Sequence, residues 1–395
     1  MINKEFERLG NEPSVIRRIF AYGLEQAKRI GAENVYDFTL GNPSIPAPAR
    51  VNDTIRDLID TVDSLHLHGY SMAAGFEEAR ISVAKNLTKR FGREVLPNEL
   101  FFTCGAAAAL ISSIKALSFD GAEVMVLAPF FPEYRPFIES NGAKMVLVPA
   151  DTETFQIHAD EVEKRVTKNT QAVIVNSPNN PSGVVFSAET IRALGEVLER
   201  KSREFGHPIY ILSDEPYREL VYDGVKAPFI PGIYRNTVIC YSWSKSLSLP
   251  GERIGYVYVP SDIDDAAEFF AAVAGASRIM GHVCPPSLMQ RVVAEACVEE
   301  PDLETYDRNR RLLYSSLTEM GYECVKPQGA FYLFVKAPNG DGDAFAETAM
   351  KDYNLLVVPA AGFGCPEYVR LAYCVETEMI ERSLPAFRAM IERTR

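Results

Sequence analysis

One lysine, flanked by hydroxyl residues and followed by an arginine, has the clearest potential for chemistry in this sequence. In SWSKSLSLPGERIGY, Lys245 follows Ser242 and Ser244, and Arg253 comes shortly after. An ε-amine can form an imine with an aldehyde, hydroxyls can donate to phosphate oxygens, and a guanidinium can clamp a phosphate dianion through two hydrogen bonds. The segment therefore suits a small molecule that carries an aldehyde and a phosphate. The competing interpretation is a solvated lysine in a serine-rich loop.

A second segment, SDEPY, supplies groups that would suit a nitrogen-containing aromatic ring. It places Asp214 and Tyr217 just past the apolar run IYIL. A carboxylate there can pair with a protonated ring nitrogen and keep the ring cationic, so that it accepts electrons from a carbanion. The alternatives are that Asp214 caps the following helix and that Tyr217 packs half-buried.

A third segment, NSPNNPSG (176–183), is too rich in Pro, Asn and Gly to be anything but a tight turn. Its simplest interpretation is a turn without a further role. In a functional interpretation, the amide of Asn180 donates to a phenolate oxygen on the ring. A cis peptide bond between Asn180 and Pro181 would fix that geometry.

The elements that must position these segments are those of an α/β fold. Between about residues 98 and 260, short apolar runs recur: LFFT, VMVLAP, MVLVPA, AVIVNSP, IYILSDE, VICYSWS and IGYVYV. Such runs are typical of strands buried on both faces, and the helical stretches between them predict βα units with a mainly parallel sheet. Ligands of such sheets bind beyond the carboxyl ends of the strands, which is where the polar segments fall.

The length of the chain predicts more than one core, because 395 residues with 47% hydrophobic content exceed what one core usually holds. We expect an N-terminal arm over residues 1–44, with an amphipathic helix at about 13–29, that packs with a small domain. A large domain would cover residues 45–284. A small α+β domain would cover residues 285–395 and begin with a long helical stretch over 287–320.

Composition excludes several other classes of protein. The net charge of −12 without a basic block argues against nucleic acid or an anionic membrane as the main partner. The seven cysteines are scattered without the spacing of a metal site or redox pair, so we expect no metal and a reducing compartment. The N-terminus lacks the apolar core of a signal peptide, and we expect a cytoplasmic protein without a membrane span.

Taken in chain order, NSPNNPSG, SDEPY and SWSKSLSLPGERIGY resemble the motifs of the class I/II aminotransferases of PLP fold type I, which are aspartate aminotransferase-like. The resemblance covers nearly the whole chain. It implies a large domain with a mainly parallel seven-stranded sheet between helices, a smaller α+β domain, and pyridoxal 5′-phosphate (PLP) as cofactor. It also implies a homodimer with shared active sites. Such a dimer would move an amino group between an α-amino acid and a 2-oxoacid by a ping-pong aldimine/ketimine mechanism.

The resemblance assigns a role to each matching residue. Lys245 becomes the Schiff-base lysine and proton carrier, Asp214 the partner of the pyridinium nitrogen, and Asn180 and Tyr217 the donors to the phenolate oxygen. The remaining assignments are Ser242, Ser244, Arg253, Gly105, Ala106 and Ala107 around the phosphate, Phe131 stacked on the ring, Tyr70 reaching the partner chain's cofactor, and Gly41 and Arg370, with Asn180, binding the substrate.

Several of these matches have simpler alternatives. GAAAAL makes a good helix start on its own, Phe130 or Tyr134 can fill core space in place of a stacking role, and Arg370 can be a structural ion pair. A PLP-dependent lyase (β-elimination, C–S cleavage or decarboxylation) would use the same residues, and a non-catalytic PLP-binding regulator is a remote third reading. The substrate stays open, with Arg278 and His282 as candidates for the side-chain pocket.

Overall fold

The computed structural model describes residues 1–11 and 14–394, which divide into two compact units. The larger unit comprises Ile45–Asn180 and Val184–Pro301. The smaller unit comprises Met1–Ser44, Pro181–Gly183 and Asp302–Arg395.

The seven apolar runs form the seven strands of one sheet in the larger unit. The strands are β2 (Leu100–Thr103), β3 (Glu123–Leu127), β4 (Lys144–Val148), β5 (Thr170–Asn176), β6 (Tyr210–Asp214), β7 (Thr237–Ser242) and β8 (Gly255–Tyr258). Their order is β2-β8-β7-β6-β5-β3-β4, in which β8 is antiparallel to both neighbours and every other pair is parallel. The predicted mainly parallel sheet is confirmed.

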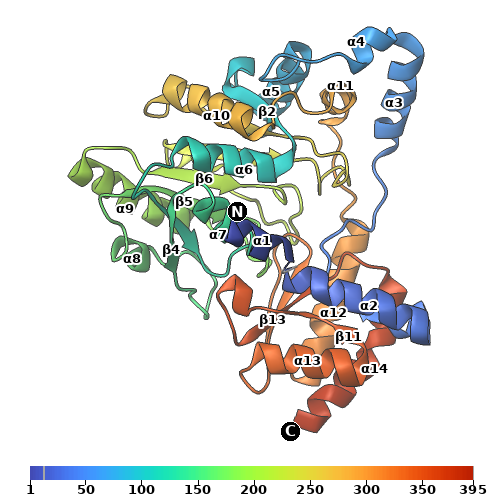
Figure 1. Ribbon diagram of the computed structural model, residues 1–395. Coiled ribbons are helices and arrows are strands. Elements are labelled where there is room, and N and C mark those ends of the chain that lie inside the picture. The colour runs from blue at the N-terminus through green and yellow to red at the C-terminus, as the bar shows by residue number, and fades with distance from the viewer. Residues whose placement is uncertain (12–13, 395) are drawn as a thin grey trace. The chain divides into compact units, whose positions relative to one another are not determined.

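Both faces of this sheet are buried because alternate residues of each strand enter different cores. On β7, Val238 and Cys240 join one core, and Ile239 and Tyr241 join the other. Helices α6 (Gly105–Ala116), α7 (Tyr134–Glu139) and α10 (Ala266–Met280) cover the first face; α3 (Ala49–Thr61), α5 (Glu77–Phe91) and α11 (Ser287–Ala296) line the second core. Figure 1 shows α6 and α10 packed side by side over the sheet. The other helices of this unit are α4 (Ser64–His68), α8 (Ala159–Glu163) and α9 (Ala188–Phe205).

The boundary between the two units differs from the expected one after residue 284. The stretch over 287–320 is not one helix but two, α11 and α12 (Glu304–Met320), and the smaller unit resumes only at Asp302. Helix α11 belongs to the larger unit because its apolar face, which includes Met289 and Val293, is buried in the second core of the sheet. Pro301 follows α11 and precedes the next helix.

The smaller unit is built around a short antiparallel sheet of order β12-β13-β10-β9. Its elements are α1 (Lys4–Asn11), α2 (Val15–Ile30), β1 (Tyr36–Asp37), α12, β9 (Cys324–Val325), β10 (Tyr332–Lys336), α13 (Gly342–Tyr353), β11 (Leu355–Leu356), β12 (Val358–Pro359), β13 (Tyr368–Ala372) and α14 (Thr377–Thr394). Strand β1 pairs in parallel with β11, which ties the N-terminal segment to the C-terminal one. The expected first helix corresponds to α2, and its expected first residue, Pro13, lies outside the described residues.

No helix within residues 1–11 and 14–394 is both long enough and apolar enough to cross a membrane. The longest ones, α9 and α14, have 18 residues each and carry charges along their length.

Candidate active site

Polar residues gather at one edge of the seven-stranded sheet, where several strands end or begin together. β5 ends at Asn176, β6 at Asp214 and β7 at Ser242. Asn176 lies opposite Asp214 in the parallel register, and Ser242 lies opposite Gly255, which in turn lies opposite Thr103 at the end of β2. This is the edge where open α/β sheets bind ligands.

The carboxylate of Asp214 is held by two neighbours and has one unsatisfied oxygen. The hydroxyl of Tyr134, at the start of α7, donates to Oδ2. The amide Nδ2 of Asn176 donates to the same oxygen at 3.3 Å and to the Asp214 carbonyl at 2.9 Å. Oδ1 is buried without a hydrogen-bond partner among the residues that the structure describes. Because such an atom is costly to bury, it indicates a donor or cation that the polypeptide itself does not supply.

The same surroundings shift the ionisation of this pair. Burial raises the pKa of Asp214 to about 7, and the hydrogen bond from Tyr134 acts in the opposite direction. Burial, with the adjacent Asp214, raises the pKa of the Tyr134 phenol well above its ordinary value, so that Tyr134 stays a donor. A cation placed at Oδ1 would favour the ionised carboxylate.

Tyr134 and Asn176 are the two residues at this edge that the sequence did not identify as functional. The sequence indicates only a core-filling role for Tyr134, and its ring does lie edge-on to Phe131, with 5.7 Å between centroids. Asn176 shows no functional signal in the sequence. A signal for it exists only once the strand order is known, because that order places the end of β5 beside Asp214.

Asn176 also fixes the turn that contains Asn180. Asn176 accepts through Oδ1 a hydrogen bond of 2.8 Å from the backbone N–H of Asn180. The backbone N–H of Asn179 donates to the carbonyl of Val184 at 2.9 Å, which closes the turn. The cis bond in this turn is Ser177–Pro178, so the prediction of a cis bond between Asn180 and Pro181 is wrong. Asn180 is therefore buried and connected through Asn176 to Asp214.

An anion-binding arrangement forms where β2 leads into α6. Gly105, the first residue of α6, has φ +85°, and a Cβ there would lie 3.0 Å from Nη2 of Arg253. Glycine thus lets the guanidinium approach the start of the helix, whose first N–H groups favour anions. Nη1 of Arg253 donates to the carbonyl of Pro250 at 2.9 Å, which orients the guanidinium. Ala106 and Ala107 follow in the first turn of the helix.

The remaining candidates of the larger unit differ in exposure. Ser242, Ser244 and Tyr217 are buried, whereas Lys245 and Phe131 are half-buried. Tyr70, between α4 and α5, is 94% exposed. Of the two candidates for substrate selectivity, Arg278 is exposed and His282 is half-buried.

In the smaller unit, Arg370 is a buried cation on β13, one of the two inner strands of the four-stranded sheet. Its Nη2 donates to the carbonyl of Thr39 at 2.5 Å. Its guanidinium lies over the rings of Tyr332 and Phe363, at 4.5 and 5.3 Å from their centroids. A Cβ on Gly41 would lie 2.0 Å from the Tyr332 hydroxyl, so glycine is required beside this ring. The carbonyl accepts one hydrogen bond from this cation and the two ring faces attract it, and a guanidinium is also suited to bind a carboxylate through two hydrogen bonds.

Known proteins share this architecture over the whole chain. Residues 32–387 match the family model described as aminotransferase class I and II. An aspartate aminotransferase from Pyrococcus abyssi is 30% identical over 389 residues, which cover 94% of each protein. Aromatic-amino-acid aminotransferase 2 from Thermococcus litoralis is 29% identical over 396 residues, which cover 96% of each.

Solved structures of aminotransferases are also similar to this chain. An aminotransferase from Eubacterium rectale has 51% identity and a TM-score of 0.97, with 100% of this chain and 99% of that one covered. The aspartate aminotransferase from Thermus thermophilus with maleate has 26% identity and a TM-score of 0.85, with 99% of both chains covered.

The mainly parallel sheet and the smaller antiparallel sheet define an enzyme of PLP fold type I. The chain belongs to the class I and II aminotransferases, and its activity is amino-group transfer. The predicted family, fold class and enzyme class are confirmed, and the comparisons give no support to the lyase alternative.

Proposed function

We propose that this transaminase holds PLP through Lys245 and transfers an amino group from an α-amino acid to a 2-oxoacid in two half-reactions. The observation that carries the proposal is the buried carboxylate of Asp214, in which Oδ2 accepts from Tyr134 and Oδ1 has no partner among the described residues. A pyridinium N–H is a donor and a cation, which is what Oδ1 lacks.

The residues at the sheet edge fit the other parts of PLP. The start of α6, with Gly105, Ala106 and Ala107, and the nearby guanidinium of Arg253 suit its phosphate, and Ser242 and Ser244 add hydroxyl donors. Asn180 and Tyr217 are proposed as donors to its phenolate oxygen, and Phe131 as the ring against its face. Lys245 supplies the amine.

When bound, the cofactor supplies an electron sink that stabilises negative charge at the substrate α-carbon. The chain's own groups carry out the remaining steps. With the cofactor bound, the amine of Lys245 would accept the proton from the substrate α-carbon and would later donate it to the carbon of the cofactor's former aldehyde group. The ionised carboxylate of Asp214 would stabilise the protonated ring nitrogen, and this cation would in turn favour the ionised form of Asp214. Tyr217 and Asn180 hold the ring in place by donating hydrogen bonds.

For the substrate, we propose that the guanidinium of Arg370 grips the α-carboxylate through two hydrogen bonds and that the backbone of Gly41 contributes to the same contact. A guanidinium can bind a carboxylate through two parallel hydrogen bonds, and the buried position of Arg370 on β13 would fix the place and direction of that grip. Asn180 would complete the substrate contacts.

We also propose a homodimer in which Tyr70 contacts the phosphate bound by the partner chain. The support is its exposure, since a tyrosine that is 94% exposed in one chain is a natural contact residue for a second chain. Seven cysteines, all free thiols, favour a reducing compartment and hence the cytoplasm.

The experiment is to titrate purified protein, reconstituted with PLP, with one amino acid at a time and to record absorption between about 320 and 430 nm. Because two relatives are named for aspartate and aromatic amino acids, these are the first donors to test. Loss of the visible band together with formation of one equivalent of oxoacid supports the proposal. A band that never changes with any amino acid, or ammonia or carbon dioxide as product, contradicts it.

A further inference from the structure

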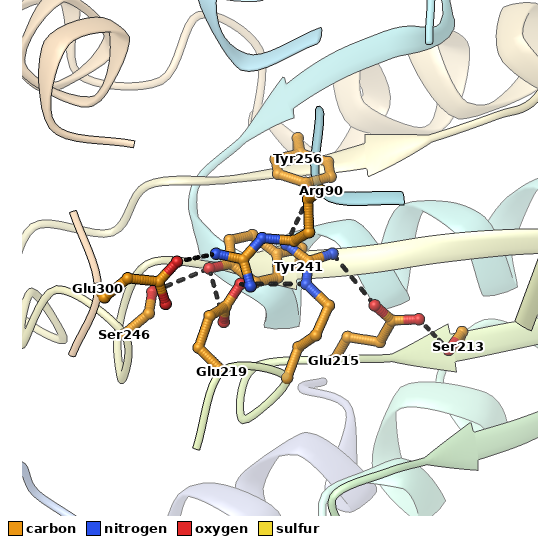
Figure 2. Close-up of polar contacts among 9 residues, drawn as sticks. Arg90, Ser213, Glu215, Glu219, Tyr241, Ser246, Tyr256 and Glu300 are labelled. Atoms are coloured by element: carbon orange, nitrogen blue, oxygen red, sulfur yellow. Dashed lines mark hydrogen bonds and ion pairs between the residues drawn. The ribbon is translucent and has the colours of Figure 1, made fainter. Parts of the chain in front are cut away.

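A buried group of charged and hydroxyl side chains lies beside the proposed site without belonging to it. We call it the Arg218 cluster and define it as Ser213, Glu215, Arg218, Glu219, Tyr241, Ser246 and Tyr256. Figure 2 shows its polar contacts, together with Arg90 and Glu300. Three of its members carry a charged side chain and have low exposure: Arg218 is 8% exposed, Glu219 7% and Glu215 4%. The proposed function does not use any of them.

Arg218 is at the centre of the cluster and is satisfied from several directions. Its Nη1 donates to Glu215 Oε2 at 3.2 Å and its Nε donates to Glu219 Oε1 at 3.1 Å. Its Nη2 donates to the hydroxyl of Tyr256 at 3.1 Å, and its guanidinium lies 4.1 Å from the centroid of the Tyr241 ring. A buried cation with this many partners fixes their positions, because displacing one leaves a buried charge incompletely paired.

A chain of hydrogen bonds runs from the arginine to the lysine segment. The hydroxyl of Tyr241 donates to Glu219 Oε2 at 3.1 Å. It also lies 2.8 Å from the hydroxyl of Ser246. A tyrosine hydroxyl has one proton, and Tyr241 donates it in the hydrogen bond to the Glu219 carboxylate. Ser246 is therefore the donor in the second hydrogen bond. Ser246 directly follows Lys245 in the sequence.

The other end of the cluster adjoins Asp214. Ser213 and Glu215 flank Asp214, and the hydroxyl of Ser213 donates to Glu215 Oε1 at 2.6 Å. The backbone N–H of Glu215 donates to the carbonyl of Cys240 on β7 at 2.9 Å, so the sheet pairing continues one residue past Asp214. Side chains alternate along a strand, so Ser213 and Glu215 point away from the face on which Asp214 meets Tyr134.

A second guanidinium group lies beside Glu219. Arg90, at the end of α5, lies 3.7 Å from Glu219 Oε1 through Nη1 and 2.9 Å from Glu300 through Nη2. Glu215 and Glu219 therefore face two guanidinium groups. The ring of Phe91, with its centroid 5.2 Å from the Arg218 guanidinium, adds an apolar wall.

Resting on the proposed function, we propose that the Arg218 cluster is a positioning network for the reactive lysine and the carboxylate. The network connects the backbone after Lys245 to the backbone after Asp214 through five side chains: Ser246, Tyr241, Glu219, Arg218 and Glu215. It lies on the face of the sheet opposite to the Asp214 side chain. These residues act through Lys245 and Asp214 and contact neither substrate nor cofactor. Small displacements of reacting groups are enough to slow an enzyme severely.

The test uses the PLP-loaded enzyme and two small changes at one link of the network. Tyr241→Phe removes the hydroxyl that joins Ser246 to Glu219. Ser246→Ala removes the hydroxyl that donates to Tyr241. The matched control is Tyr258→Phe, since Tyr258 is a tyrosine of β8 that is 1% exposed, and its hydroxyl has no hydrogen-bond partner among the described residues. Each protein is measured for kcat, KM, thermal unfolding and the visible circular dichroism per bound cofactor.

We expect Tyr241→Phe and Ser246→Ala each to lower kcat by about tenfold with little change in KM and to alter the visible circular dichroism. The double variant should be no worse than the more impaired single variant, because both changes break the same link. Tyr258→Phe should retain the wild-type kcat and spectrum.

Two results would overturn the positioning role while leaving the proposed function intact. One is that Tyr241→Phe and Ser246→Ala keep the kcat and dichroism of Tyr258→Phe, even if their unfolding temperature falls. The other is that their effects on kcat multiply in the double variant, which would make them independent. A wild-type protein that binds no PLP would instead overturn the proposed function itself, and the network proposal with it.

Discussion

The hydroxyl of Tyr134 donates a hydrogen bond to Oδ2 of Asp214, while Oδ1 of the same carboxylate has no partner among the described residues. This bond lowers the pKa of Asp214 against the larger effect of burial. In Tyr134→Phe the pKa of Asp214 should therefore rise. At a given pH a larger fraction of Asp214 would then be protonated and unable to pair with the protonated ring nitrogen of the cofactor. We expect the acidic limb of the kcat/KM profile to move to higher pH, with a loss of about tenfold near neutrality.

The control for this variant is again Tyr258→Phe, which removes a buried tyrosine hydroxyl from β8 without touching Asp214. An acidic limb that stays in place in Tyr134→Phe would mean that Tyr134 does not govern the ionisation of Asp214.

The stability of the cofactor-free protein should depend on pH through Asp214. Its folded-state pKa of about 7 is above its ordinary value of 3.8, so the folded state binds this proton more tightly than the unfolded state. The contribution is fully present below about pH 4 and is lost as pH rises through about 7. Asp214→Asn cannot titrate and should lack this loss.

The measurement is the urea midpoint of cofactor-free wild type and Asp214→Asn between about pH 5 and pH 8. We expect the wild type to lose stability relative to the variant as pH rises. Midpoints that change in parallel would show that Asp214 titrates in its ordinary range.

A methyl group at Gly105 should weaken PLP binding strongly, while it lowers the free energy of unfolding only slightly. Gly105→Ala places a Cβ 3.0 Å from Arg253 Nη2 at φ +85°, which moves the guanidinium away from the start of α6. Gly206→Ala is a matched control, because Gly206 has φ +78° and nothing lies within 4 Å of its Cβ position. Both variants should lose about 1 kcal/mol of stability through backbone strain.

Only Gly105→Ala should weaken PLP, by about tenfold or more, in an equilibrium titration of the cofactor-free protein. Equal dissociation constants for the two variants would remove Gly105 from the phosphate site.

Arg370→Lys should affect substrates and spare the cofactor. Lysine keeps the positive charge and loses the bidentate geometry, so KM for every α-amino acid should rise by about tenfold to a hundredfold, whatever the side chain. The dissociation constant of PLP should stay unchanged, which separates lost binding from misfolding. A variant with unchanged KM would identify Arg370 as a structural residue of β13.

The sequence was sufficient to predict elements whose signal is local. Each strand of the large sheet is a continuous apolar run. Asp214 comes at the end of one such run, and Asn180 lies in the Pro- and Asn-rich turn that follows another, so their places could be predicted. Asn176 and Tyr134 could not be recognised, since their contacts with Asp214 depend on strand order and on where α7 begins.

The domain boundary and the buried charges were missed for a related reason. The apolar periodicity of α11 predicts an amphipathic helix but does not say which core buries it. Glu215, Arg218 and Glu219 look like a solvated, charged segment, and they are buried because Tyr241 and Tyr256 from two other strands enclose them.

The most direct test of the account is to find the lysine that carries the cofactor. The PLP-loaded protein is reduced with borohydride, which fixes the cofactor to its lysine, and is then digested and analysed by peptide mass spectrometry beside Lys245→Ala. We expect the pyridoxyl mass on the peptide that contains Lys245 in the wild type and no labelled peptide in the variant. Label on another lysine, or label that persists in Lys245→Ala, would contradict the account.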